Sequence, residues 1–225
     1  MKRPEEINVL IACEESQAVT IAFRKRGFNA FSCDIQDCSG GHPEWHYKDD
    51  ILNVMNKKGF CDGVYQEPYW DIMIAFPPCT HLACSGAKHF SKKIADNKQK
   101  PAIDFFLQFT KLPYPWAIEN PVGIMSTNYR IPDQIIQPWY FGDEFQKTTC
   151  LWLNGLPKLF HAAETDLFND TVTHVGKGEF VTTPSGKRLP KWYSDNKNAK
   201  NRSKTFPGIA EAMATQWGDY LINSL

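Results

Sequence analysis

The stretch Ile7-Asn8-Val9-Leu10-Ile11-Ala12-Cys13 decides the fold. It is a short apolar run rich in β-branched residues, and its length suits a buried strand better than a helix. From Ser16 to Arg26 the apolar positions follow a helical spacing, and Gly27 marks a helix end. A second strand covers Ala30-Phe31-Ser32-Cys33 and ends at Asp34. Strand, helix and strand in this order predict the opening of a parallel sheet.

The rest of the chain continues this pattern. We predict further strands at Trp70–Phe76, Trp116–Glu119 and Thr149–Leu153, and helices at Leu52–Lys58, Ala102–Thr110 and Gly208–Leu225. Residues 86–100 are Lys-rich and indicate a loop or an exposed helix, and from Pro157 to Lys200 the apolar period fades. We therefore expect an α/β protein with a Rossmann-like, doubly wound, mostly parallel sheet. Residues 1–156 and 201–225 would form the catalytic domain, with residues 157–200 a small irregular insert.

The composition is that of an ordinary globular enzyme. Its 25 Lys and Arg residues balance 25 Asp and Glu residues, so a nucleic acid would have to bind a local basic face. The seven cysteines show no close pairing and the first residues are polar, which favours a reducing cytosol. No apolar run approaches the roughly 20 residues that span a bilayer. We expect a cytoplasmic monomer with no membrane partner.

Three acids and a cysteine come just beyond the ends of predicted strands. They are Asp34, Asp50, Cys79 and Glu119. In doubly wound sheets, ligands bind at the carboxyl ends of the strands. The sequence therefore predicts one active site that contains all four.

Cys79 follows a strand directly, in Phe76-Pro77-Pro78-Cys79, and the two prolines restrict its backbone. A lone cysteine is more often an inert buried thiol. Here Glu119 stands at another strand end, in Ile118-Glu119-Asn120-Pro121. A thiolate that adds to carbon 6 of a pyrimidine makes carbon 5 nucleophilic, and a carboxylic acid at ring nitrogen 3 stabilises the developing charge. The pair predicts covalent attack on a pyrimidine, with some local activation of a thiol whose ordinary pKa is about 8.5.

Pro77-Pro78-Cys79 together with Glu119-Asn120 resembles the cytosine-5 DNA methyltransferases, in particular the short, divergent members common in phage genomes. The resemblance implies a class I methyltransferase fold and methylation of carbon 5 of a cytosine flipped out of duplex DNA, with S-adenosyl-L-methionine as cofactor. It implies that Cys79 is the nucleophile and that Glu119 and Asn120 belong to the catalytic set. Lys147 joins them, since the family usually has arginines in the segment Gln146-Lys147-Thr148-Thr149, and lysine supplies only a point charge. A role in restriction-modification, in the host cytoplasm, would follow for a phage protein.

The resemblance also implies a cofactor site. Asp50 resembles the acid that contacts the adenine ring, and Asp34 the acid that holds the ribose hydroxyls. The predicted cofactor residues are Cys13, Glu14, Ser16, Asp34, Ile35, Asp50, Ile51, Pro77 and Ser203. In the first loop, Ser16 is expected to cap the following helix and Glu14 or Glu15 to bind the cofactor's ammonium group. This loop has no glycine, whereas the family has a glycine-rich turn.

Two basic segments are candidates for DNA contacts. Between Gly176 and Thr205 there are eight Lys or Arg residues against two acids, with Trp192 and Tyr193 among them, which suits phosphate contacts and base stacking. The lysines after Cys79 resemble the family's loop that closes on the flipped base. The predicted contacts are Lys88, Lys92, Lys93, Lys187, Arg188, Lys191, Trp192 and Arg202. For both segments a solvated charged loop is the alternative. So small an insert predicts short or relaxed sequence specificity.

Other interpretations stay open. Cys33, Cys38, His42 and His46 have a spacing that resembles a zinc site, although Cys33 lies inside a predicted strand, and we predict no metal. Cys84 is a rival nucleophile that lacks the prolines. The Cys79 chemistry would also serve a free pyrimidine nucleotide, or a modified alkyl donor in a phage hypermodification pathway. A third possibility is a non-catalytic DNA-binding relative.

Overall fold

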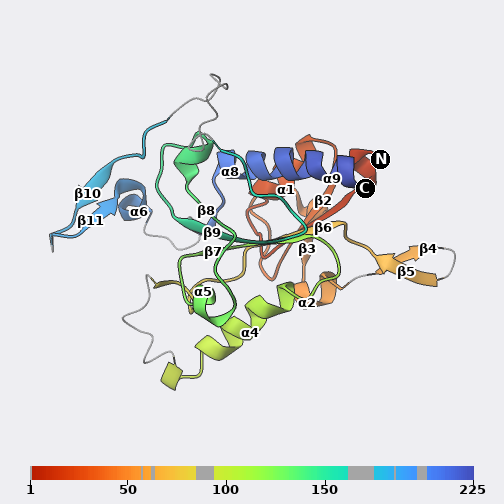
Figure 1. Ribbon diagram of the computed structural model, residues 1–225, viewed down its shortest axis with the longest axis horizontal. Helices are drawn as coiled ribbons and strands as arrows, with labels where there is room; N and C mark the ends of the chain where they lie inside the picture. Colours follow the sequence, from red (N-terminus) through yellow and green to blue (C-terminus); the bar gives the residue numbers. More distant parts are fainter. Residues whose placement is uncertain are drawn as a thin grey trace.

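The computed structural model of the protein describes residues 2–56, 58–61, 64–84, 94–161, 175–184, 186–196 and 202–225. For residues 58–61 and 64–68 it describes the backbone alone. A central sheet carries helices on both faces (Figure 1).

Seven strands form the central sheet, in the order β3-β2-β1-β6-β7-β9-β8. Their bounds are β1 (Asn8–Ala12), β2 (Asn29–Asp34), β3 (His46–Lys48), β6 (Ile72–Ala75), β7 (Trp116–Pro121), β8 (Gln134–Ile136) and β9 (Thr149–Asn154). The first five strands in this order are parallel, and β9 runs antiparallel to its neighbours β7 and β8. The predicted α/β class with a mostly parallel sheet is confirmed, and the sheet is compatible with a Rossmann-like fold.

The helices form one layer on each face of the sheet (Figure 1). One layer contains α1 (Ala18–Lys25), α8 (Pro207–Ala212), the π-helical η5 (Met213–Trp217) and α9 (Gly218–Ser224), and the other contains α2 (Ile51–Val54), α4 (Gln99–Phe109) and α5 (Met125–Asn128). Short 3-10 turns complete the body at η1 (Pro4–Glu6), η2 (Pro43–Trp45) and η4 (Pro138–Phe141).

The two layers create two hydrophobic cores, and β1 contributes to both. Val9 and Ile11 pack in the core under α1 and α8, whereas Leu10 and Ala12 pack in the core under α2 and α4. All four side chains are fully buried. Burying a Val, Leu or Ile side chain contributes about 1.5–3 kcal/mol. The continuous apolar run of the first strand is thus explained by a strand with no solvent-facing side.

The C-terminal helices pack closely on α1 and the turn that follows it. Gly218 lies against the ring of Phe28, where a Cβ atom would come within 2.8 Å of two ring carbons. Arg26 donates hydrogen bonds to the Ala214 carbonyl (3.1 Å) and to Asp219 (2.5 Å). The predicted C-terminal helix is confirmed, with a π-helical turn in its middle.

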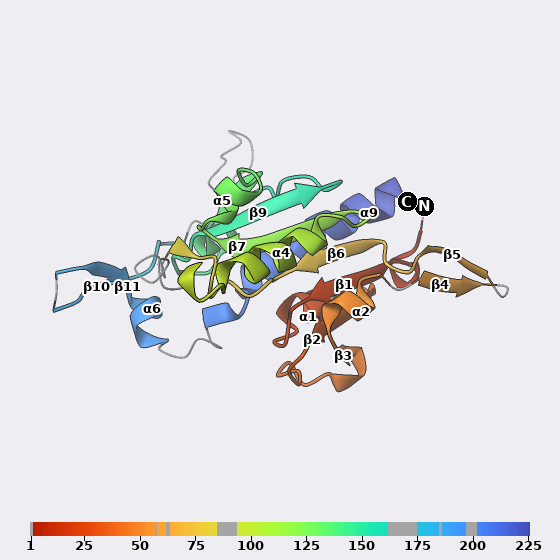
Figure 2. The same ribbon diagram turned by 90° about the horizontal axis from the view of Figure 1, so that it is seen from below.

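Two hairpins extend from the body, at opposite ends. One is β4 (Lys58–Cys61) with β5 (Val64–Pro68), and the other is β10 (Phe180–Thr182) with β11 (Arg188–Pro190), followed by α6 (Lys191–Asp195). In Figure 2 the arrows of β1 and β6 point toward the end that carries β10, β11 and α6. The carboxyl ends of the parallel strands therefore lie beside the predicted insert.

Some sequence predictions need correction. The helix expected at Leu52–Lys58 ends at Val54, and Lys58 begins β4. The short strands β3 and β8 and both hairpins were not predicted. The domain boundaries stay a prediction. Leu159, placed in the insert, is fully buried in the core, and the Gln134 side chain bonds both of its backbone groups (2.7 and 2.8 Å).

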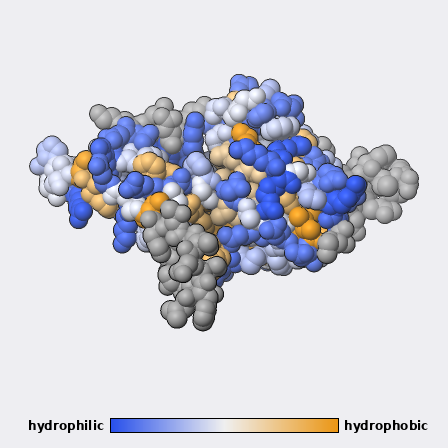
Figure 3. Space-filling model, turned by 90° about the horizontal axis from the view of Figure 1, so that it is seen from above, coloured by the Kyte–Doolittle hydropathy of each residue, from blue (hydrophilic) through white to orange (hydrophobic). Residues whose placement is uncertain are grey.

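The surface is mostly polar on the face seen in Figure 3, where strongly hydrophobic residues form small separate patches. Within the described ranges, no helix has the length and apolar character to cross a membrane.

Candidate active site

The carboxyl ends of four adjacent strands form one continuous edge. In spatial order these ends carry Asp34 as the last residue of β2, Cys13 directly after β1, Pro77 two residues after β6, and Asn120 within the last residues of β7. Backbone and side-chain hydrogen bonds join them. The Phe76 amide donates to Ala12 O (2.9 Å), and Asn120 Nδ2 donates to Pro77 O (2.8 Å). The structure therefore places the predicted strand-end residues along one edge of the sheet in two groups, Cys79 with Glu119, and Asp34 with Asp50 beside Cys13.

The turn that carries Cys79 is fixed on several sides. Its carbonyl accepts hydrogen bonds from the amides of Leu82 and Ala83, each at 2.9 Å. Gly123, just after β7, lies so close that a Cβ atom there would stand 2.2 Å from Leu82 O. The Ile124 amide also donates to Leu82 O (2.9 Å). Cys79 itself is half-buried. The position of the thiol is thus restricted both by the two prolines before it and by the tertiary contacts of the turn with Gly123 and Ile124.

Asn120 has a positioning role in this turn. It is 1 % exposed, and its side-chain amide holds the carbonyl of Pro77. Its Oδ1 has no hydrogen-bond partner among the residues that the structure describes. A buried acceptor without a partner is costly, so a polar ligand at this point would stabilise the site.

The charges around Cys79 oppose one another. Burial raises the pKa of the thiol, and the neighbouring Glu119 raises it further, whereas Lys147 and Arg202 lower it. Since only the thiolate is a nucleophile, both cations favour the reactive form. These three charged side chains come from parts of the chain far apart in sequence.

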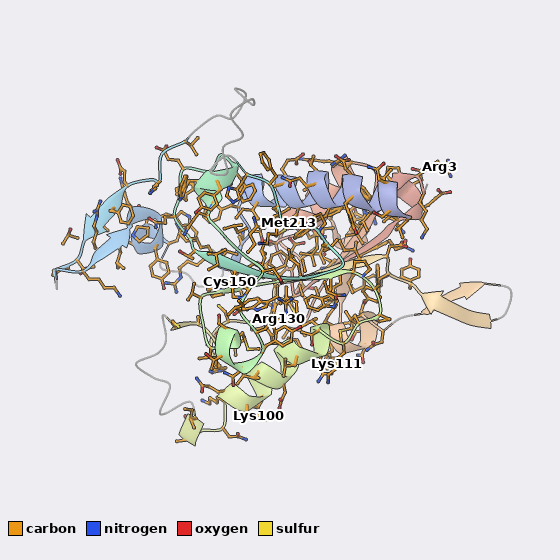
Figure 4. The ribbon with its side chains drawn as sticks, in the orientation of Figure 1. Arg3, Lys100, Lys111, Arg130, Cys150 and Met213 are labelled. Atoms are coloured by element: carbon orange, nitrogen blue, oxygen red, sulfur yellow. The ribbon has the colours of Figure 1, made fainter. Side chains whose placement is uncertain are left out.

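Glu119 lies on β7 opposite β9. Burial raises the pKa of its carboxyl, and Lys147 and a hydrogen bond from the Thr149 side chain oppose this shift. Its neighbour Asn120 pairs with Cys150 of β9, which is labelled on the sheet in Figure 4. A raised pKa favours the neutral acid, which can donate a hydrogen bond.

Lys147 links β9 to the segment 202–206. Its Nζ atom lies 3.5 Å from Lys204 O and 6.0 Å from the centre of the Phe206 ring. Phe206 in turn packs on Trp192 of α6 and on Phe145, with ring centres 5.0 and 5.4 Å apart. This aromatic cluster of Phe145, Trp192 and Phe206 joins the insert to the site.

The first loop and the strands beside it form a second group of predicted residues. Burial raises the pKa of the Cys13 thiol, and the negative charges of Asp34 and Asp50 raise it further. Asp34 accepts a hydrogen bond from the Gln36 amide (2.9 Å), and Asp50 caps α2 through the Leu52 amide (3.0 Å). Ile35 between them in sequence is 75 % exposed, an unusual position for an aliphatic side chain beside a carboxylate.

The first loop adopts glycine-like backbone conformations without containing glycine. Cys13 and Gln17 both have φ near +58°. The close backbone approach that a glycine allows is made here by Gly40 of the next loop. A Cβ atom on Gly40 would lie 2.6 Å from Gln17 Cβ and 2.7 Å from Ser16 O. Gln17 also bonds both backbone groups of His42 (2.7 and 3.1 Å). The prediction found neither Gln17 nor Gly40, although the Gly40-Gly41 pair was a visible signal.

Glu14 caps α1, a role expected for Ser16. Its carboxylate accepts hydrogen bonds from the amides of Val19 (2.7 Å) and Thr20 (3.2 Å) and from the Thr20 hydroxyl (2.7 Å). The N-cap residue is Gln17, which makes no side-chain cap bond, so the capping role of Ser16 is wrong. Glu14 is buried and its carboxylate already accepts three hydrogen bonds, so its binding of a cofactor ammonium group stays a prediction without support from these contacts.

The predicted DNA contacts stay predictions. Lys187 just before β11, Arg188 on β11 and Lys191 on α6 are exposed, and Lys191 pairs with Glu179 (2.5 Å). Trp192 belongs to the aromatic cluster, which occupies part of its ring surface. Lys88, Lys92 and Lys93 lie outside the described residues. Ile51 and Pro77 are buried and Ser203 is exposed, and their cofactor contacts stay predictions.

The zinc interpretation finds no support. The Cys33 thiol donates to Asp49 O (3.5 Å), the His46 ring bonds the Ser32 hydroxyl (2.8 Å), and His42 stacks on Trp45 at 3.9 Å. In the part of the chain that the structure covers, no group of three or more His, Cys, Asp or Glu side chains could hold a metal ion.

Comparison with known proteins adds no assignment: no protein-family model matches the chain, and no protein of curated function matches its sequence.

Proposed function

We propose that the protein is a DNA (cytosine-5-)-methyltransferase that transfers a methyl group to carbon 5 of cytosine through a covalent adduct on Cys79. One observation carries the proposal. A half-buried thiol, a carboxyl with a raised pKa and a lysine meet at the carboxyl edge of a parallel sheet, from three separate segments. These are the nucleophile, acid and cation that attack on a pyrimidine requires.

Each side chain has a defined task in the reaction. The Cys79 thiolate forms a bond to carbon 6, and the electron pair of the 5,6 double bond becomes available at carbon 5. Glu119 donates a hydrogen bond to ring nitrogen 3, where negative charge develops. S-adenosylmethionine, when bound, would supply the methyl group as a sulfonium: carbon 5 would form a bond to the methyl with its electron pair, and the S–CH3 bond would break to leave S-adenosylhomocysteine. Loss of the carbon 5 proton to a base then restores the double bond and expels Cys79 as thiolate.

The fold supports the finer assignment to the class I methyltransferases. Numbered by chain order within the central sheet, the strands follow the sequence 3-2-1-4-5-7-6, with the seventh reversed. This is the arrangement that the resemblance implies. Asp34 and Asp50 suit a nucleoside, because a carboxylate can accept hydrogen bonds from ribose hydroxyls and an exposed Ile35 can cover an adenine ring.

The location of the basic insert favours DNA over a free nucleotide. Its exposed Lys187 and Arg188 lie on the hairpin at the same end as the carboxyl ends of β1 and β6 (Figure 2). Since the chain has no net charge, this local face is where a polyanion would bind.

The decisive experiment is mass analysis of the nucleosides in DNA from cells that express wild type, Cys79→Ser or Cys84→Ser. We expect 5-methyldeoxycytidine with wild type and with Cys84→Ser, the matched control, and none with Cys79→Ser. Product in Cys79→Ser cells would overturn the covalent mechanism. A heavier cytosine derivative would indicate a modified donor, and methylated free nucleotide with unmodified DNA would indicate the nucleotide substrate.

A second measurement separates an enzyme from a DNA-binding relative. Duplex DNA that contains 5-fluorocytosine has no carbon 5 proton to lose, so the enzyme is trapped on it. We expect a covalent adduct with wild type in the presence of S-adenosylmethionine and none with Cys79→Ser. Binding of the DNA without an adduct would support a non-catalytic protein.

A further inference from the structure

The Cys79 site has a difficulty in the proposed reaction. Burial and Glu119 both disfavour the thiolate, yet the reaction needs it. Glu119 on β7 must itself stay close, because it contacts the same base. The thiolate therefore depends on the cations nearby, and among the described residues these are Lys147 before β9 and Arg202.

Arg202 comes from a part of the chain far from Glu119 and Lys147 in sequence. It stands at the start of the segment 202–206, directly after the insert, and its guanidinium carbon lies 4.7 Å from the centre of the Tyr193 ring on α6. Two residues further on, Lys204 O lies 3.5 Å from Lys147 Nζ. The aromatic cluster then fixes the end of the segment through Phe206. The segment 202–206 thus links Arg202 to Lys147, the other cation that acts on the Cys79 thiol.

We infer that Arg202 is the second cation of the Cys79 site, that Tyr193 of α6 holds it there, and that it stabilises the attacking thiolate together with Lys147. The inference rests on the proposed function, because the thiolate matters only if Cys79 is the nucleophile. The contacts of Arg202 with Tyr193 and of Lys204 with Lys147 are independent of that function. The resemblance expects arginine in the segment after Gln146, where this chain has Lys147, Thr148 and Thr149. Arg202 supplies the guanidinium from a different part of the chain.

The chemistry of arginine suits this position. A guanidinium can place its flat face on an aromatic ring while its N–H groups, which lie in the plane, remain free for an anion. Tyr193 is 40 % exposed, so it can support Arg202 without itself being part of the core. Because α6 holds the arginine, displacement of the insert would remove a cation from the thiol. The reactivity of Cys79 is then coupled to the position of the element that carries the predicted DNA contacts.

The test is the pH dependence of Cys79 alkylation by iodoacetamide, followed by peptide mass spectrometry that resolves Cys79 from Cys84. It needs neither DNA nor cofactor. In Arg202→Gln we expect the Cys79 profile to move to higher pH and the rate at pH 7.5 to fall about three- to tenfold, because the thiolate fraction falls. Arg202→Lys should restore part of the rate. Lys177→Gln is the matched control, since Lys177 also lies over an aromatic ring, 5.1 Å from the centre of Trp139.

A second variant guards against a loss of folding. Tyr193→Ala removes the support of Arg202 at a part-exposed position, and we expect a smaller shift in the same direction, with no shift in Tyr193→Phe. Unchanged Cys79 profiles in both Arg202→Gln and Tyr193→Ala would overturn the inference. Lost methylation with an unchanged profile would also overturn it, while leaving the proposed function intact. A shifted profile in a protein that methylates no DNA would support the inference and refute the function.

Discussion

Glu14 gives the sharpest test of how the first loop is built. Its carboxyl is fully buried at the start of α1 and accepts three hydrogen bonds, from Val19 and twice from Thr20. Burial raises the pKa of this group from 4.5 to about 7 despite those donors. The substitution Glu14→Gln removes the titration and keeps the size. The substitution should therefore change both the free energy of unfolding and the way in which that free energy depends on pH.

The sign and size follow from linkage. The unfolded chain releases the proton near pH 4.5, whereas the folded chain keeps it to about pH 7. Between these values the folded state binds more protons, so the contribution of Glu14 is fully present below pH 4.5 and is lost as the pH rises through 7. A change from 4.5 to about 7 corresponds to about 3 kcal/mol. Above pH 7 both states are ionised and the curve is flat.

Urea unfolding at pH values from 4.5 to 8.5 measures this effect. We expect the unfolding free energy of wild type minus that of Glu14→Gln to fall by about 3 kcal/mol across the range. Glu5→Gln, which removes an exposed carboxylate, is the control for the loss of one charge. A difference that stays constant with pH would refute the reasoning, because it would mean that Glu14 titrates alike in both states.

Three further predictions concern the site. Asn120→Ala leaves the Pro77 carbonyl without its donor, so we expect a loss of about 1–3 kcal/mol in urea unfolding and at least a tenfold lower methylation rate; full activity would show that the turn holds itself. Gly40→Ala brings a Cβ atom against Ser16 O, so calorimetry should show weaker S-adenosylmethionine binding, and unchanged affinity would separate this loop from the cofactor. Lys187→Gln should weaken binding equally on unrelated DNA duplexes and reduce the salt slope by about 1, whereas a sequence-dependent loss would assign Lys187 to base recognition.

The sequence predicts the centre of the sheet better than its edges. The run from Val9 to Ala12 is recognisable because both faces of the strand are buried, so that every position is apolar. The edge strands β3 and β8 have three residues each, too few for a period to show. In β8, Gln134 is buried because its side chain bonds the backbone of Leu159, a contact between residues 25 positions apart. Local patterns carry no trace of such a contact.

The candidate site divides in the same way. Cys79 and Glu119 can be predicted because each follows or ends an apolar strand, and parallel strands end at one edge. The positions of Asn120 and Arg202 relative to Cys79 could not be predicted from the sequence. The contact of Asn120 with Pro77 spans 43 residues. Arg202 acts on the Cys79 thiol from 123 positions further along the chain, in the segment 202–206, where the Lys204 carbonyl lies near Lys147.

The left-handed backbone of Cys13 and Gln17 has a consequence for ligand binding. A non-glycine residue in this conformation costs about 1–2 kcal/mol, and the hydrogen bonds of the Gln17 side chain offset part of that cost during folding. A glycine-rich turn can relax into many shapes when it is empty, whereas residues with side chains have fewer alternatives. The loop is therefore already rigid before a ligand arrives. A molecule bound against it loses little chain entropy, and more of its contact energy is retained as affinity.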